Sequence, residues 1–341
     1  MIHPWNRGAW DALPSFERLP PVLLLAGPHG VGKSAFARAL AQSLLCLARP
    51  ASRVACGECA GCRLFASGNH PDYRLVEPAV AGDEDDSSAE EGGARAKPGA
   101  AARWIKVDAV RALGDFLALT SHLGGSKVVL IDPADRLHPS ASNALLKTLE
   151  EPVNTRFVLV TARPARVPAT VRSRCVRMVF ALPEPDAARA WLTNQGVAEP
   201  DTVLAMAGGA PVRAMALNDS EQLQLRKLLV DRIFGTNRFD PIAAVDALGA
   251  DPATLLVPAL QRWCYDLLLS QATGTVRYYP DCAQILHPVA RRAPKHQLLR
   301  FLKELQDVAR HLEHPLNARL LAERCLIGYR NAITGSETSR A

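Results

Sequence analysis

The stretch Gly27–Ser34 constrains the fold of this chain more than any other part of its sequence. It reads Gly-Pro-His-Gly-Val-Gly-Lys-Ser, the pattern G-x-x-x-x-G-K-S of a phosphate-binding loop. It follows the apolar run Val22–Ala26, which is typical of a buried strand, and it precedes Ala35–Leu45, whose apolar spacing predicts a helix. Because this loop lies between a strand and a helix, the sequence predicts a nucleotide cradle and not a simple glycine turn.

Each residue type in this loop has a chemical role in binding a phosphate. The glycines allow backbone N–H groups to approach an anion closely, and the N-terminus of the following helix adds partial positive charge. Lys33 would reach the β- and γ-phosphates, and Ser34 would hold Mg²⁺. We therefore predict that ATP or ADP with Mg²⁺ is bound by Lys33, Ser34 and the glycines Gly27, Gly30 and Gly32.

The size and composition of the chain favour a cytoplasmic protein of two or three domains. Its 341 residues are 48% hydrophobic, which is enough for a sizeable core. No apolar run approaches the roughly 20 residues that span a bilayer, and the N-terminus lacks the order of a secretory signal, so we expect no membrane partner. The formal net charge of +6 mildly favours an anionic partner such as nucleic acid, although an Arg-rich composition alone gives the same balance.

The apolar pattern changes along the chain and divides it into three parts. Residues 1–177 alternate strand-like and helix-like segments, which is typical of a parallel sheet covered by helices. The low-complexity segment 82–102 cannot bury apolar surface, and we expect it to be a disordered surface insertion. Residues 178–218 and 219–335 have helical patterns and predict two further domains.

Two predictions of local structure can be compared directly with the fold. Apolar residues recur at helical spacing over 104–117, which predicts one amphipathic helix. A second helix is expected to be capped by Ser140, to run through Glu151 and to end at Pro152.

Four cysteines, Cys46, Cys56, Cys59 and Cys62, form the pattern C-x9-C-x2-C-x2-C. The two-residue gaps place successive thiolates on one side of a tight turn, and Cys46 supplies a fourth ligand from the end of the phosphate-loop helix. Four thiolates suit a closed tetrahedral Zn²⁺ site with no open position for catalysis. We therefore predict a structural zinc site, with an iron–sulfur cluster or unliganded thiols as the alternatives.

The segment Lys127–Asp132 has the form of a second nucleotide-binding motif, a hydrophobic strand that ends in an acid able to bind Mg²⁺ through water. In an active ATPase of this class the next residue is Glu, which orients the attacking water. Here it is Pro133, which has no acceptor in its side chain. Asp135 is offset by three positions, and we expect it to point elsewhere. The pattern therefore predicts a nucleotide site that does not hydrolyse its nucleotide.

In this order the motifs resemble those of the AAA+ subunits of bacterial clamp loaders, and more narrowly the delta-prime type of subunit. The resemblance covers about residues 5–217 strongly, and the helical remainder fits in length and character. One departure is the intact phosphate loop, which is degraded in several delta-prime subunits. The motifs that carry the resemblance are Gly27–Ser34, the four cysteines, Asn69–Tyr73, Ile131–Arg136, Ser142–Pro152 and Thr170–Cys175.

The resemblance implies a fold that is α/β plus all-α. An AAA+ P-loop domain with a parallel sheet would occupy residues 1–177, with the zinc module at 46–62. A small helical lid domain would follow over 178–218. A C-terminal helical collar domain over 219–335 would assemble with the collars of other subunits.

The resemblance also implies a function. The chain would be a stator-like subunit of the hetero-oligomeric, pentameric clamp loader of DNA polymerase III, which loads the sliding clamp onto primed DNA. Its partners would be gamma/tau and delta subunits. Arg174 of the Ser-Arg-Cys triplet would be an arginine finger that acts in trans on a neighbour's ATP. Thr161 and Arg213 would match the first and second nucleotide sensors, although an ordinary strand residue and a solvated helical Arg are alternatives.

Two other functions fit parts of the sequence. An ATP-hydrolysing subunit of the gamma/tau type is favoured by the intact loop and opposed by Pro133. A stand-alone zinc protein that binds nucleic acid is allowed by the cysteines and the basic charge, but few aromatic residues or lysines surround the cysteines.

Overall fold

The computed structural model describes residues 2–48, 50, 53–79, 104–236, 238–249, 251–312 and 317–335. The segment 82–102, where we expect an insertion, lies outside these residues. The chain divides into two compact units, Met1–Glu184 and Pro185–Ala341. Each unit has its own hydrophobic core.

The first unit is built on a sheet of five parallel strands in the order β2-β3-β4-β1-β5. Every residue of β1 and β3 is buried, as expected for strands that helices cover on both faces. The inner strands β1 and β4 are neighbours, and Ala26 pairs with Thr161 at their carboxyl ends. The strands are β1 (Val22–Ala26), β2 (Tyr73–Val76), β3 (Lys127–Ile131), β4 (Thr155–Thr161) and β5 (Val176–Val179).

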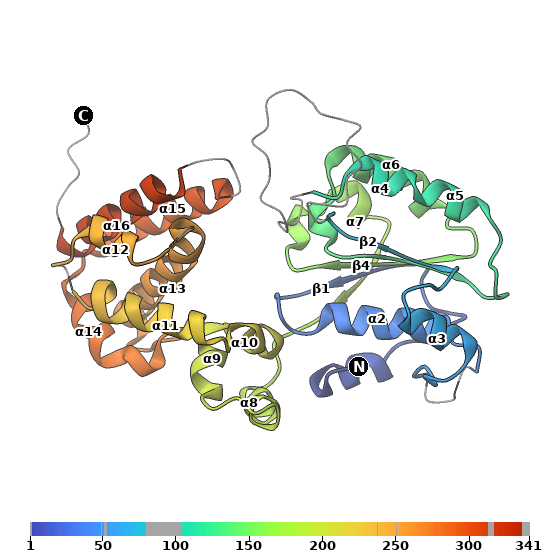
Figure 1. Ribbon diagram of the computed structural model, residues 1–341, viewed down its shortest axis with the longest axis horizontal. Helices are drawn as coiled ribbons and strands as arrows, with labels where there is room; N and C mark the ends of the chain where they lie inside the picture. Colours follow the sequence, from blue (N-terminus) through green and yellow to red (C-terminus); the bar gives the residue numbers. More distant parts are fainter. Residues whose placement is uncertain are drawn as a thin grey trace. The chain divides into compact units, whose positions relative to one another are not determined.

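Helices cover both faces of this sheet (Figure 1). One face is covered by the helix that follows the phosphate loop, α2 (Lys33–Leu44). The N-terminal helix α1 (Arg7–Asp11) and the short helix of the cysteine segment, α3 (Ala60–Ala66), lie on the same side of the sheet. The other face is covered by α4 (Val107–Arg111), α5 (Leu113–Ala118), α6 (Pro139–Glu150) and α7 (Ala169–Arg172).

The structure corrects both predictions of local structure. The single helix expected over 104–117 is two short helices, α4 and α5, that meet at Ala112. The break falls between Val110 and Leu113, which are both buried, so the apolar spacing continues through it. Ser140 does not cap α6, because Pro139 already begins the helix and His138 is the cap, with its ring accepting from the N–H of Ser140.

The second unit is entirely helical within the described residues. Its main core surrounds Trp263, whose indole N–H donates to the hydroxyl of Tyr329 over 2.9 Å, and that hydroxyl donates to the carbonyl of Phe234. A smaller cluster joins the first three helices. The helices are α8 (Pro185–Asn194), α9 (Pro200–Met206), α10 (Pro211–Leu217), α11 (Ser220–Leu229), α12 (Pro241–Asp246), α13 (Pro252–Thr273), α14 (Ala283–Arg292), α15 (Lys295–His311) and α16 (Ala318–Thr334).

A parallel α/β unit followed by an all-helical unit confirms the predicted fold class, α/β plus all-α. The division of the helical part into a lid over 178–218 and a collar over 219–335 stays a prediction. Across the described ranges, no helix combines the length and the apolar character that crossing a membrane requires.

Candidate functional site

The predicted phosphate loop connects β1 to α2 at the carboxyl edge of the sheet. Gly30 and Gly32 have φ angles of 79° and 86°, in the left-handed region that favours glycine. A Cβ atom at Gly27 would lie only 2.2 Å from the carbonyl oxygen of Phe180, so a larger residue would displace the backbone there. The backbone of this loop therefore fits the close approach of a phosphate.

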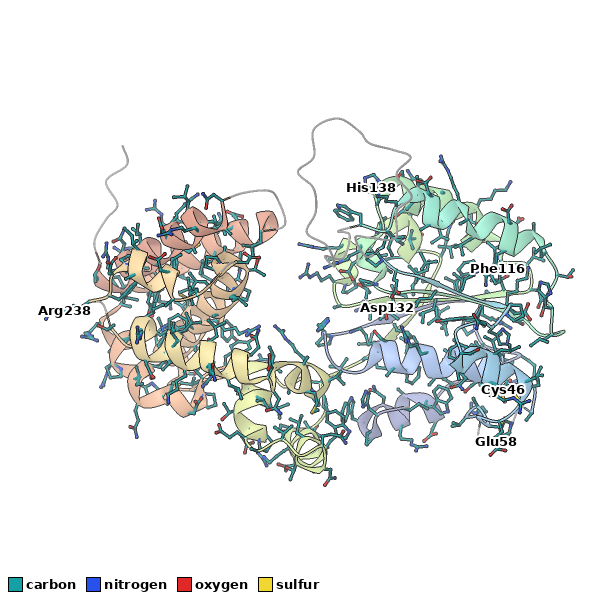
Figure 2. All side chains as sticks on the ribbon, in the orientation of Figure 1. Cys46, Glu58, Phe116, Asp132, His138 and Arg238 are labelled. Atoms are coloured by element: carbon teal, nitrogen blue, oxygen red, sulfur yellow. The ribbon has the colours of Figure 1, made fainter. Side chains whose placement is uncertain are left out.

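Charged groups converge beside the loop. Asp132 directly follows β3 (Figure 2), and its carboxylate shares a hydrogen bond with the side chain of Ser34. Burial raises the pKa of Asp132, while Ser34 and the Lys33 ammonium favour its charged form. Burial lowers the pKa of Lys33, and the charges of Asp132 and Asp135 oppose that shift. Lys33 Nζ also donates to the carbonyl of Pro28 over 2.6 Å. This set of a cation, a hydroxyl and carboxylates could hold a polyphosphate with a divalent ion.

Asp135 belongs to this site, so the expectation that it points elsewhere is wrong. Thr161, fully buried at the end of β4, donates its hydroxyl to Asp135 Oδ1 over 2.6 Å. The same hydroxyl accepts the N–H of Arg163 over 3.0 Å. A 3-10 turn over Ala134–Arg136 directs Asp135 back toward β4. The predicted sensor Thr161 is thus oriented by the carboxylate of Asp135.

The N-terminal segment packs on the end of the phosphate loop. Trp5 Nε1 and Asn6 Nδ2 both donate to the carbonyl of Val31, over 3.0 and 2.9 Å. The ring of His3 stacks on Trp5, and a Cβ atom at Gly32 would lie 2.3 Å from its Cδ2. No sequence motif marks this segment, and its only signal is a pair of aromatic rings near the N-terminus.

The structure brings the four predicted cysteine ligands together just after the end of α2. Figure 2 labels Cys46 at this place. All four sulfur atoms lie within 4.8 Å of one another. Cys46 Sγ lies 3.6 Å from Cys56 Sγ and 3.9 Å from Cys59 Sγ, and Cys56 Sγ lies 3.9 Å from Cys62 Sγ. A tetrahedral ion with metal–sulfur bonds of about 2.3 Å separates its sulfur ligands by about 3.8 Å. The cluster could therefore hold a metal ion with little rearrangement.

Backbone donors already point at these sulfur atoms. The N–H groups of Cys56, Cys59 and Cys62 each lie 3.4 Å from a thiol of the preceding cysteine in the cluster. Burial disfavours the thiolate of Cys59, but donors that include the N–H groups of Cys62 and Leu47 outweigh it and lower its pKa to about 6. The backbone donors thus favour the thiolate of Cys59, the form that binds a metal, whereas burial raises the pKa of Cys62.

Two buried polar residues of the Asn69–Tyr73 motif support the chain beside the cysteine segment. The ring of His70 accepts the N–H of Asp72 over 3.1 Å. The carboxylate of Asp72 accepts from the N–H groups of His122 and Leu123, over 2.8 and 3.0 Å, and from the hydroxyl of Ser121. Burial opposes the charge of Asp72, but these donors prevail and lower its pKa. The carboxylate therefore fixes the loop between α5 and β3.

The predicted finger Arg174 follows α7 and is 30% exposed. Its guanidinium donates to the carboxylate of Glu150, at the end of α6, and to the carbonyl of Thr170 over 2.7 Å. A longer contact reaches the hydroxyl of Ser173. None of these partners belongs to the phosphate loop, so the structure does not place Arg174 with the loop residues of its own chain.

The predicted second sensor, Arg213, lies in α10 of the second unit. Burial lowers the pKa of its guanidinium, and the nearby charge of Arg262 acts in the same direction. Its role toward a nucleotide stays a prediction, because the loop residues belong to the first unit.

Comparison with known proteins identifies the family. A family model described as "DNA polymerase III, delta subunit" matches residues 11–184. The delta-prime subunit of DNA polymerase III from Pseudomonas aeruginosa is 38% identical, over 81% of this chain and 78% of the relative. The corresponding subunit from Escherichia coli is 34% identical, over 78% and 75% of the two chains. A tau/gamma subunit from Haemophilus influenzae is 30% identical over 80% of this chain but only 38% of its own length. The chain belongs to the delta-prime family of DNA polymerase III subunits.

Proposed function

We propose that this delta-prime-type subunit acts within the clamp loader as a stator that supplies Arg174 to the ATP of a neighbouring gamma/tau subunit. A guanidinium is permanently charged and presents a planar fork of donors, so it can stabilise the charge that develops on a transferring phosphoryl group. The observation that carries the proposal is the set of contacts that hold Arg174. Arg174 is partly exposed and has its partners in α6, in α7 and in the turn after α7, and none of them is a residue of the chain's own phosphate loop.

The chain's own loop would bind a nucleotide without hydrolysing it. Lys33, Ser34 and Asp132 could hold a nucleotide with Mg²⁺, and the ion would supply positive charge against the phosphates. Pro133 offers no acceptor to a water molecule. Asp135 is a carboxylate nearby, but it already accepts the hydroxyl of Thr161. We therefore assign these residues to binding, with Thr161 oriented by Asp135.

The cysteine cluster would hold one Zn²⁺ with a structural role. Four thiolates close the tetrahedron and leave no position for a substrate. The ion would fasten the end of α2 to α3, because Cys46 follows the first helix and Cys59 and Cys62 lie at the start of the second.

The partners in this proposal are gamma/tau and delta subunits, with the sliding clamp and primed DNA reached through the complex. The helical segment 219–335 would form the collar contacts, and 178–218 would act as the lid that carries Arg213. The assembly would be a pentamer that works in the cytoplasm during DNA replication.

The trans role of Arg174 is tested in the reconstituted complex. Arg174→Ala should lower the DNA-stimulated ATPase by about 10³-fold at the interface that it serves, the scale of other arginine fingers, while this chain's own nucleotide affinity stays unchanged. Arg177→Ala is the matched control, because Arg177 is an exposed arginine of the neighbouring strand β5. An unchanged ATPase in the Arg174→Ala complex would exclude the finger role.

A second function, ATP hydrolysis by this chain itself, is favoured by the complete phosphate loop. Its test is the ATPase rate of the isolated chain with Lys33→Ala as the control. A rate comparable to that of a gamma/tau subunit, abolished by this substitution, would replace the stator proposal.

A further inference from the structure

Arg174 is held by a second residue, Glu150, the last residue of α6. Arg174 Nε donates to Glu150 Oε1 over 2.9 Å, and Nη2 donates to the same oxygen. Nη1 donates to the carbonyl of Thr170 in α7 over 2.7 Å. The plane of the guanidinium is thus fixed by acceptors from two different helices.

These contacts leave donor capacity for a further ligand. A guanidinium has five N–H groups, and its Nη2 atom carries two of them. The contact with Glu150 engages one N–H of Nη2, so the other is available to an oxygen of a phosphate. The side chains of Arg174 and Glu150 are 30% and 50% exposed, so a group on another subunit can reach them.

We propose that Glu150 is a positioning residue for Arg174, which orders the guanidinium before the neighbour's nucleotide arrives. The inference rests on the proposed trans role of Arg174. An unrestrained arginine loses rotamer freedom when it binds, whereas a side chain that is already ordered loses less. The gain should appear in the rate of hydrolysis, because the finger acts on the charge of the transition state. The carboxylate is too exposed to be required for folding of the unit.

The test uses the reconstituted complex and the variants Glu150→Ala and Glu150→Gln. Glu150→Ala should lower the kcat of the DNA-stimulated ATPase about fivefold, the scale of an exposed hydrogen-bonded ion pair, with the KM for ATP unchanged. Glu150→Gln should retain most of the rate, because its side-chain carbonyl can still accept from Nε and Nη2. Glu151→Ala is the matched control, since Glu151 is the next residue, is exposed and follows α6.

A double variant shows whether Glu150 acts through Arg174. In the Arg174→Ala background, Glu150→Ala should have no further effect, because the residue that it positions is gone. If Arg174→Ala alone leaves the rate unchanged, the trans role and the positioning role both fail. If Arg174→Ala lowers the rate but Glu150→Ala leaves kcat unchanged or raises it, only the positioning role is overturned. Melting temperature and gel filtration confirm that each variant folds and assembles.

Discussion

The cysteine cluster gives the prediction with the most direct physical measure. Replacing Cys62 with Ser removes one of four thiolates from a site in which three pairs of sulfur atoms lie 3.6 to 3.9 Å apart and all four lie within 4.8 Å of one another. The separation in a tetrahedral zinc site is about 3.8 Å. Structural zinc in small peptides binds with an apparent free energy of about 10–16 kcal/mol. A quarter of that, about 3 kcal/mol, corresponds to a loss of roughly 100-fold in zinc affinity.

The assay is metal analysis of the purified chain together with a competitive chelator titration. The wild-type chain should hold about one equivalent of zinc, and Cys62→Ser should lose it at chelator concentrations roughly 100-fold lower. Cys325→Ser is the control, because Cys325 is a buried thiol of α16 outside the cluster. A folded wild-type chain without metal, or a Cys62→Ser variant with unchanged affinity, would refute the reasoning.

Three further predictions concern the nucleotide site and its supports. Lys33→Ala should weaken ATP and ADP binding to the isolated chain by about tenfold or more, because it removes the cation that faces the phosphates; calorimetric titration measures this, and unchanged affinity would contradict the assignment. Thr161→Val should lower the free energy of unfolding by about 1 kcal/mol, since Asp135 loses its hydroxyl donor. Urea denaturation measures this, and an equal loss in a chain that already carries Asp135→Ala, which has no acceptor, would mean that the pair does not interact. The pKa of Asp72 is lower in the folded chain than its value of 3.8 in the unfolded chain. The contribution of its carboxylate to stability is therefore complete above pH 3.8 and is lost as the pH falls through the lower pKa of the folded chain. Asp72→Asn should therefore reduce stability at neutral pH and flatten its dependence on pH below about 4, and urea curves between pH 2.5 and about 7 check the sign.

The contacts of the N-terminal segment with the phosphate loop could not be predicted from the sequence, whereas the loop itself could. The phosphate loop was predictable because its glycines, Lys33 and Ser34 lie within one short segment. Gly30 and Gly32 adopt a backbone conformation that only glycine adopts readily. Trp5 and Asn6 bond to Val31 across 26 and 25 positions of the chain, and no local pattern records such a contact. Their placement depends on how the N-terminal segment packs on α2, where the ring of Trp10 meets that of Phe36.

Local structure was predictable where the residues involved are close together in the sequence. It was less predictable where tertiary packing sets the boundaries of a helix. The four cysteines lie within a short segment, so their spacing nearly fixes their geometry, and the structure brings all four sulfur atoms together. The break at Ala112 within the helix expected over 104–117 was not predictable, because Val110, Leu113 and Phe116 on the two sides of it are buried and the apolar spacing runs through it. The cap at Ser140 was misplaced because Pro139 can already begin α6.

The sequence alone was enough to recognise the phosphate-loop pattern, Pro133 directly after the acid that ends β3, the group of four cysteines and the family. These are properties of residue types at short fixed spacings. Only the tertiary structure decided that Asp135 serves Thr161, across 26 positions, and that Glu150 holds Arg174, across 24. Both pairs join segments that the strand order and helix packing bring together, and the chemistry of a side chain does not specify which distant group it will meet.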